Sequence, residues 1–449
     1  MYQKAKDLAV NSMLTLGKRT VTGMLSAGGK QFQDWSATYR LFEKERIKQT
    51  ELFAPAIENV ISNVDEQSPF FAMMDDTLLR KSGRKISGTG WKRDPLGPAF
   101  YNNFIWGQRY LQISAALPDQ EVAGRARAIP IGFYHAPSPA KPRKKDPPEA
   151  WCEYKAQQKI LKISAVGKNR LAELREQIPD RKIICSVDGG FTNLEVFRSI
   201  PENTVLIGRI RKDARLFKIP EEPLHTSRGR IKYYGEPLPT PEQVRQDESI
   251  PWQKVAAFAA GKQREFDVKI MAPVRWKSSK NRDMLVIVIR PLSYLPHKGA
   301  RLLYRNPAYL ICSDIHMPLE QLLQAYLWRW EIELNFRDEK TIMGVGEAQV
   351  RTVAAVQSVP AFLVASYSYL LLAGHSVDAK PTCLPSPKWA SNESSNRCST
   401  QKMISLFRSQ YWNVDVDPNK TGFVSNSPLT RTHFFSPNSP NSALCYALK

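Results

Sequence analysis

The stretch Tyr326–Lys340 (YLWRWEIELNFRDEK) constrains the fold most, because it has the pattern of one charged and aromatic helix late in the chain. An α-helix turns by about 100° per residue, so four polar side chains of the stretch would share one face. These four residues are Tyr326, Arg329, Glu333 and Lys340, and the other three acids of the stretch would point elsewhere. A solvated helix with surface ion pairs is the common explanation of such a pattern. Large apolar side chains between the charges leave little solvated surface, so we expect a buried helix or an active-site wall.

The charge of the chain favours a polyanionic partner. The sequence holds 64 Lys and Arg against 43 Asp and Glu, a net charge of +21. Nucleic acid is the usual partner of such a basic protein. No apolar run reaches the length of about 18 residues that a membrane-spanning helix needs. The longest candidate, Val359–Gly374, contains a proline and two serines and is predicted to be a buried helix.

The cysteines and histidines indicate the kind of metal site that the chain can build. Its six cysteines are scattered, without a C-x-x-C pair or a nearby histidine, and its six histidines are equally dispersed. This pattern argues against a zinc site or a disulfide framework and fits a reducing cytoplasm. The N-terminus shows no secretory signal. Any metal would therefore be held by carboxylates.

Two apolar runs upstream of the helix each lead to an acid. Phe70–Thr77 (FFAMMDDT) is predicted to be a strand that ends in Asp75 and Asp76. Ile183–Phe191 (IICSVDGGF) is predicted to be a buried strand that ends in Asp188. An aspartate before glycine is also a common turn residue, which is the alternative explanation of Asp188. Acids at strand ends lie at the edge of a sheet, where a metal can be held.

Further strands and a helix are predicted around these runs. Tyr110–Leu117 and Ala128–Tyr134 have the pattern of strands, Trp151–Gln177 that of a helix, and Thr204–Ile210 that of another strand. Between residues 212 and 305 the pattern changes to short strands, turns and prolines. That change predicts a β-rich insertion before the late helix.

The spacing of Tyr326, Arg329, Glu333 and Lys340 resembles the Y-R-E-K signature of DDE transposases from bacterial insertion sequences. The resemblance is to the branch that cuts and pastes through DNA hairpins, and MDDT and VDGGF fit the same family. It covers roughly residues 70 to 375. It implies a ribonuclease-H-like α/β fold, a mixed sheet flanked by helices, with acids on the first strand, at the end of the fourth strand and on a late helix.

The resemblance also implies the catalytic acids and the cofactor. The acids would be Asp75 or Asp76, then Asp188 and Glu333. They would hold Mg²⁺, with Mn²⁺ able to replace it, and two ions are expected. The family pattern of aspartate, one residue and threonine favours Asp75 with Thr77. Since neighbouring residues on a strand point to opposite faces, only one aspartate of the doublet would be a direct ligand.

Resemblance and local charge together predict six contacts with DNA: Tyr326, Arg329, Lys340, Tyr309, Lys81 and Arg84. The two cations of the late helix would clamp phosphates, and its tyrosine would hydrogen-bond a phosphate near the cleaved bond. Tyr309 would stack on a base flipped out of the DNA end, and a core tyrosine is the alternative. Lys81 and Arg84 belong to a basic loop after the first strand.

The chain is predicted to have five parts. They are an N-terminal helical DNA-binding domain (1–65), the first part of the catalytic core (66–211), the β-rich insertion (212–305), the second part of the core with the Glu333 helix (306–375) and a C-terminal segment (376–449). A helical bundle with an ordinary basic surface is the alternative for the first part. The last part is rich in Pro, Ser and Asn, which predicts partial disorder.

The predicted function is cut-and-paste DNA transposition, with metal-dependent cleavage at transposon ends, hairpin formation and strand transfer into target DNA. The expected partners are double-stranded DNA, as terminal inverted repeats and as target, and a second copy of the chain on that DNA. No membrane partner is expected. The expected location is the bacterial cytoplasm, at the nucleoid. The alternatives are a ribonuclease-H-like endonuclease without strand transfer and a catalytically inactive DNA-binding protein.

Overall fold

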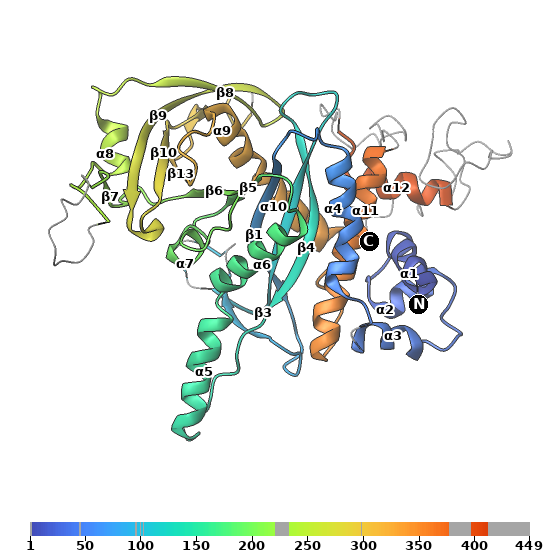
Figure 1. The fold of residues 1–449 in the computed structure, drawn as a ribbon. Coiled ribbons are helices and arrows are strands. Elements are labelled where there is room, and N and C mark those ends of the chain that lie inside the picture. Colours follow the sequence, from blue (N-terminus) through green and yellow to red (C-terminus); the bar gives the residue numbers. More distant parts are fainter. Residues whose placement is uncertain are drawn as a thin grey trace.

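The computed structural model describes residues 2–376 and 397–411, apart from positions 45, 95, 96, 99, 102, 221–232 and 298. It is a mixed α/β protein built on one large mixed sheet flanked by helices, as the sequence predicted (Figure 1). Most of the predicted C-terminal segment 376–449 lies outside the described residues. Within that segment the structure describes helix α12 (Thr400–Tyr411).

Five strands form the centre of the sheet. In spatial order they are β4 (Ala126–Ala136), β3 (Phe104–Pro118), β1 (Phe70–Arg80), β5 (Ile183–Val187) and β6 (Thr204–Arg209). Strands β1, β5 and β6 run parallel, whereas β3 is antiparallel to both β1 and β4. The apolar run of β5 is fully buried, as expected for a parallel strand covered on both faces. This order is consistent with a ribonuclease-H-like core.

The first strand does not end at its acids, which corrects the prediction. Strand β1 continues to Arg80 because β3 pairs with it as far as Gly107. On its other side, pairing with β5 stops where Met74 lies opposite Val187. Asp75 therefore lies in the middle of β1 but beyond the end of β5. Asp75 and Asp76 therefore have no paired strand on the β5 side, because β5 ends before it reaches them.

The helix predicted over Trp151–Gln177 is two helices, α5 (Pro148–Ile160) and α6 (Ile163–Gln177). The break comes at Lys162, whose backbone is extended with ψ of 135°. No residue of α5 is buried, and the helix projects from the body in Figure 1, whereas α6 packs on the sheet. The two helices follow different directions because only α6 has a buried face.

Four helices precede the sheet: α1 (Tyr2–Leu14), α2 (Val21–Ala27), α3 (Ser36–Glu43) and α4 (Gln49–Ser62). The hydroxyl of Thr20 caps α2 by accepting a 3.1 Å hydrogen bond from the Gly23 amide. Helix α4 contacts strand β4, so the N-terminal helices are joined to the sheet through it.

Helix α11 (Val353–Ser376) lies beside α4 and covers β4 (Figure 1). By length and composition it could cross a membrane, but 89% of its most apolar stretch is buried inside the protein, as in a core helix. The buried helix predicted from Val359–Gly374 is therefore confirmed. Helix α12 is tied to the N-terminal part by Arg408, which donates hydrogen bonds of 2.8 and 2.9 Å to the carbonyls of Met13 and Thr15.

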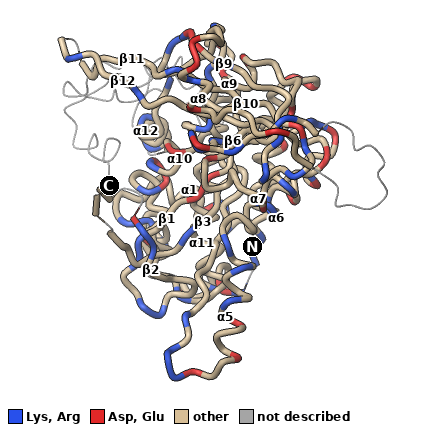
Figure 2. The backbone as a smooth tube through the Cα atoms, turned by 90° about the vertical axis from the view of Figure 1, so that its left-hand side faces the viewer, with Lys and Arg blue, Asp and Glu red and all other residues tan. Residues whose placement is uncertain are grey.

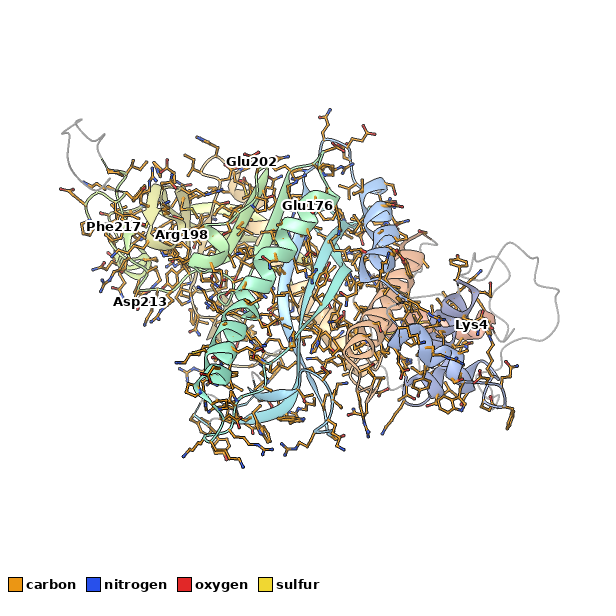
Figure 3. All side chains as sticks on the ribbon, turned by 60° about the horizontal axis from the view of Figure 1, so that its bottom comes forward. Lys4, Glu176, Arg198, Glu202, Asp213 and Phe217 are labelled. Carbon is orange, nitrogen blue, oxygen red and sulfur yellow. The ribbon has the colours of Figure 1, made fainter. Side chains whose placement is uncertain are left out.

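The predicted β-rich stretch extends the same sheet beyond β6, and residues 229–232 of one predicted strand lie outside the described residues. Its elements are β7 (Leu216–Phe217), α8 (Pro241–Gln246), β8 (Gln253–Ala259), β9 (Lys262–Trp276), β10 (Asp283–Ile289), β11 (Ser293–Tyr294) and β12 (Leu303–Tyr304). Strands β11 and β12 pair with each other in a separate two-stranded sheet, and β13 (Ala308–Cys312) follows the stretch. Strand β13 pairs with β6, then β10, β9 and β7 follow. Figure 3 shows Phe217 of β7 at one end of the molecule and Lys4 of α1 at the other.

Glycine is required at position 107, where β3 lies closest to β1. A Cβ atom there would come within 2.4 Å of the Leu79 carbonyl oxygen. We expect Gly107→Ala to lower the free energy of unfolding by about 1–3 kcal/mol, since the backbone of two central strands must shift. Chemical denaturation measures this. Gly17→Ala is the matched control, because nothing lies within 4 Å of the added methyl group. Equal stability of the two variants would contradict the prediction.

Candidate active site

Asp75 and Asp188 follow the last paired residues of two adjacent strands. Met74 of β1 is in register with Val187, the last residue of β5, so the next residue is Asp75 within β1 and Asp188 just beyond the end of β5. Adjacent strands are about 4.8 Å apart, and residues in register point to the same face. Burial and then the charge of Asp188 raise the pKa of Asp75 to about 7. The pair is thus a partly buried site with an excess of negative charge.

Asp188 also shapes the turn that follows β5. Its Oδ1 atom accepts hydrogen bonds of 2.9 and 3.3 Å from the amides of Gly190 and Phe191. Among the described residues, nothing donates a hydrogen bond to its Oδ2 atom. The turn role and a ligand role are therefore compatible, since one carboxylate oxygen serves the turn and the other remains available.

The late helix is interrupted at Arg329, which corrects the prediction of one continuous helix. Helix α9 (Leu319–Trp328) ends there and α10 (Trp330–Thr341) begins after it. The amides of Arg329 and Ile332 each bond the carbonyl three residues earlier, at 3.1 and 3.2 Å. Such bonds tighten the turn relative to an α-helix. The break places Arg329 at the junction of the two helices.

Arg329 joins the first strand to the late helix. Its Nη1 atom lies 3.0 Å from Asp75 Oδ2, and its Nη2 atom lies 3.0 Å from Glu333 Oε1. The side chains of Arg329 and Asp75 are each 14% exposed. A single guanidinium group therefore lies between two of the predicted catalytic acids. It forms one ion pair with each of them, so the two carboxylates are close to each other.

Two further residues of the predicted set lie on these helices. The Tyr326 ring packs near Arg329, with the guanidinium carbon 5.8 Å from the ring centroid. Burial raises the pKa of the Tyr326 phenol, and burial lowers the pKa of Lys340. The charge of Lys340 lowers the pKa of Asp76.

Asp76 has different surroundings from Asp75. Since side chains alternate along a strand, it points to the opposite face of the sheet. There its Oδ2 atom lies 3.1 Å from Nε of Arg109 on β3. Burial raises the pKa of Asp76, the charge of Arg109 opposes that rise, and the charge of Asp188 adds to it. Asp76 is therefore held by a cation on its own face, away from Glu333's ion pair.

Tyr309 is not brought into the site. Its ring is 5% exposed in the core on β13, and its hydroxyl donates a hydrogen bond to Glu242 of α8. In this conformation the ring has no free face for a base. The core tyrosine that the sequence left as the alternative is what the structure contains.

The two basic residues of the loop after β1 are also apart from the acids. Lys81 is buried, and its Nζ atom donates hydrogen bonds of 3.0 and 2.7 Å to the carbonyls of Gly346 and Ala348. Burial lowers the pKa of Lys81 to about 8. Arg84 is exposed and lies over the rings of Trp91 and Trp106. Lys81 thus fastens a loop, whereas Arg84 belongs to an aromatic surface.

Sequence reasoning did not find Glu339, because it considered only one face of the late helix. This side chain is 1% exposed and faces the sheet near Gln112, the residue paired with Asp75 on β3. Burial raises its pKa to about 8, and its Oε1 atom has no hydrogen-bond partner among the described residues. No signal in the sequence separates this glutamate from the other acids of the late helix.

Glu339 makes stability depend on pH. Its pKa is raised from the usual 4.5 to about 8, so the folded protein holds a proton that the unfolded chain releases. The free energy of unfolding therefore falls as pH rises from about 4.5 to about 8, by on the order of 5 kcal/mol from this group. We expect Glu339→Gln to remove that fall, as measured by urea unfolding at several pH values. Parallel pH curves for variant and wild type would contradict it.

The aspartate pair has the chemistry of a divalent metal site. Carboxylate oxygens are the ligands that Mg²⁺ prefers, and burial, followed by the charge of Asp188, raises the pKa of Asp75. In the described part of the chain, however, no three acid, histidine or cysteine side chains converge on one point. The aspartate pair fits a metal ion, while Glu333 is turned towards Arg329.

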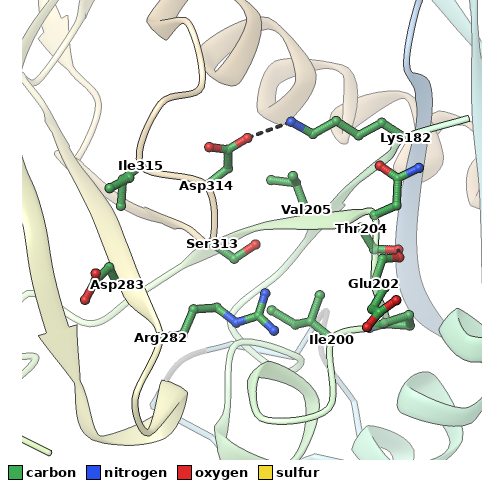
Figure 4. A pocket seen from close by; sticks show the side chains of 12 residues that line it. Lys182, Ile200, Glu202, Thr204, Val205, Arg282, Asp283, Ser313, Asp314 and Ile315 are labelled. Atoms are coloured by element: carbon green, nitrogen blue, oxygen red, sulfur yellow. Dashed lines mark hydrogen bonds and ion pairs between the residues drawn. The ribbon is translucent and has the colours of Figure 1, made fainter.

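A pocket of about 440 Å³ lies at the end of the central strands opposite to the predicted acids (Figure 4). Lys182, just before β5, lines it and lies 2.7 Å from Asp314, whereas Asp188 follows the opposite end of β5. The pocket is therefore separate from the predicted acids.

Comparison with known proteins adds one finding about the region that contains two of these acids. No curated protein matches the chain. Residues 167–367 match the family model described as the transposase DDE domain. The match contains Asp188, Arg329 and Glu333, and Asp75 lies before it. The part of the chain that carries the second strand acid and the late helix is therefore similar to the DDE domain of transposases, which indicates a transposase.

Proposed function

We propose that the protein is a cut-and-paste DNA transposase, which cleaves DNA at transposon ends and joins those ends to target DNA. One observation carries the proposal. Asp75 and Asp188 each directly follow the last paired residues of strands β1 and β5, Met74 and Val187, and Arg329 connects Asp75 to Glu333 from the late helix. The similarity of residues 167–367 to the transposase DDE domain supports the same conclusion.

The three acids are the proposed ligands of Mg²⁺, or of Mn²⁺ in its place, with two ions expected. When bound, the metal would supply activation of the attacking water or 3′-hydroxyl and stabilisation of the leaving oxygen. Asp75 and Asp188, which follow the paired residues Met74 and Val187, would form the first part of the site. Glu333 completes it when its carboxylate is released from Arg329.

Arg329 is the residue whose partners would change on DNA binding. Its guanidinium group now neutralises Asp75 and Glu333, and a DNA phosphate is a strong alternative partner for a planar fork of donors. Transfer of Arg329 to a phosphate frees both carboxylates for metal. DNA and metal binding are thereby coupled. Tyr326, which packs near Arg329, would donate a hydrogen bond to the same phosphate, and Lys340 would contact another.

Several finer features belong to the same proposal. The helices of residues 1–65 would grip DNA, and two copies of the chain would hold two transposon ends. Residues 66–211 and 306–375 would form the catalytic core, with 212–305 as its insertion. Reaction through hairpin ends and a location in the bacterial cytoplasm follow from the resemblance of the late helix to the Y-R-E-K signature.

The experiment combines the purified full chain, Mg²⁺ and labelled DNA that flanks the coding region, with a plasmid as target. We expect cleaved ends, hairpin-ended fragments and end-to-plasmid products, all of which disappear in EDTA. Cleavage without joining would favour the endonuclease alternative. DNA binding with neither product would favour the inactive DNA-binding protein.

A further inference from the structure

A second group of exposed side chains lies at the free edge of the sheet, on strand β2 (Gly90–Arg93) and its neighbour β3. Among the described strands, β2 pairs with β3 alone. We call this group the β2–β3 patch, and its residues are Arg84, Trp91, Arg93, Phe104 and Trp106.

The patch has a defined geometry. Trp91 lies opposite Trp106 in the ladder, and Arg93 lies opposite Phe104, so the four side chains point to one face. The two tryptophan rings meet edge to face at 5.6 Å. The guanidinium carbon of Arg84 lies 4.7 Å from the Trp106 ring centroid and 5.3 Å from that of Trp91. The cation thus holds both rings in place from one side.

Large aromatic side chains on this edge remain open to solvent. Trp91 is 58% exposed and Phe104 is 56% exposed. Phe100 and Tyr101, in the connection between the two strands, are 95% and 65% exposed. Aromatic rings grouped on a surface mark an interaction site more often than chance exposure does. We therefore expect the patch to bind a partner.

The charge around the patch identifies the kind of partner. Residues 81–106 contain five Lys and Arg and a single acid, Asp94. That acid is 7% exposed and lies 2.8 Å from Arg80, so it does not offset the cations at the surface. Figure 2 shows the Lys and Arg positions along the tube around β2. Open aromatic faces among cations suit unpaired nucleic acid, whose bases stack and whose phosphates are neutralised.

The patch is aligned with the proposed active site. Side chains of β3 alternate, so Trp106 shares a face with Gln112, which is paired with Asp75. Gln112 lies six residue positions after Trp106 in the strand, a distance of about 20 Å at the usual rise. This is about the length of six stacked nucleotides of one strand. One DNA strand could therefore reach from the acids to the patch.

We propose that the β2–β3 patch binds unpaired bases of a DNA strand, by stacking on Trp91 and Phe104 with Arg84 and Arg93 at the backbone. The choice of DNA over RNA rests on the proposed function. The stacking site itself rests on the exposed rings and the cations alone.

The test measures binding of two fluorescein-labelled probes to the full chain in EDTA, a 12-nucleotide single strand of thymidines and a 12-base-pair duplex. We expect Trp91→Ala to weaken single-strand binding by about five- to a hundredfold, and duplex binding by less than about twofold. Trp91→Phe retains a stacking ring and should restore most of the affinity. Tyr411→Ala, which removes a 45% exposed ring from α12, is the matched control.

Unchanged single-strand affinity in Trp91→Ala, with a wild-type melting temperature, would overturn the proposal. An equal loss for strand and duplex would overturn it too, because it would mean a contact with phosphates only. Tighter binding of a single-stranded RNA of the same length would overturn the assignment to DNA. Binding in EDTA does not require cleavage, so failure of the transposition assay leaves this test intact.

Discussion

Asp75→Asn should lower Mg²⁺-dependent cleavage by about a thousandfold or more, whereas Asp76→Asn should lower it by less than about tenfold. A metal ligand contributes several kcal/mol of charge stabilisation, which corresponds to that factor. Asp75 and Asp188 each follow the paired residues Met74 and Val187, and Asp75 shares Arg329 with Glu333. Asp76 points to the other face, towards Arg109. Initial rates on labelled end DNA measure both variants.

The two substitutions are matched, since each replaces one aspartate of the same strand by its amide. Asp188→Asn is the positive control and should be as inactive as Asp75→Asn. Melting temperatures of the variants show whether the fold is kept. A reversed order, with Asp76→Asn inactive and Asp75→Asn active, would make Asp76 the first catalytic acid and would require a different register of β1.

Arg329→Met should have two opposite effects. In the absence of DNA, the affinity for Mn²⁺ should rise by at least about tenfold, because a positive charge next to two of the ligands is removed. Cleavage should fall by about a hundredfold or more, because a bidentate phosphate contact in the transition state is lost. Electron paramagnetic resonance of free Mn²⁺ measures the first effect, and a cleavage assay measures the second.

Arg337→Met is the control for the first effect. Arg337 lies on the same helix α10, pairs with Asp338 and is 64% exposed. Its substitution therefore removes an equal positive charge from outside the site. Metal affinity of Arg329→Met equal to that of Arg337→Met would show that Arg329 does not compete with metal. The coupling of DNA binding to metal binding would then be wrong, although the assignment of the acids would stand.

The elements of the core could be predicted because their signals are local. The run IICSV is long enough and apolar enough to be a buried strand, and it is one. Boundaries were less accurate, since they depend on partners. Strand β1 runs past its acids because β3 continues to pair with it, and the helix predicted over Trp151–Gln177 divides because only its second half has a surface to pack against.

Side-chain roles were harder to predict than elements. Lys81 and Arg84 are three residues apart in one basic loop, yet only Arg84 reaches the surface. Lys81 instead donates to the Gly346 carbonyl, 265 residues away in the chain. Tyr309 was expected to stack on a base, but its ring is buried in the core on β13 and its hydroxyl donates a hydrogen bond to Glu242.

The sequence by itself determined which apolar runs become strands, that an acid follows or lies within two of them, and that a cationic chain of this kind suits nucleic acid. The tertiary structure decided which aspartate of the doublet faces the late helix, and that Arg329 lies between Asp75 and Glu333. The reason is physical. A strand or helix forms from its own residues, but the charge and burial of a side chain come from segments far along the chain, which meet it only when the sheet is assembled.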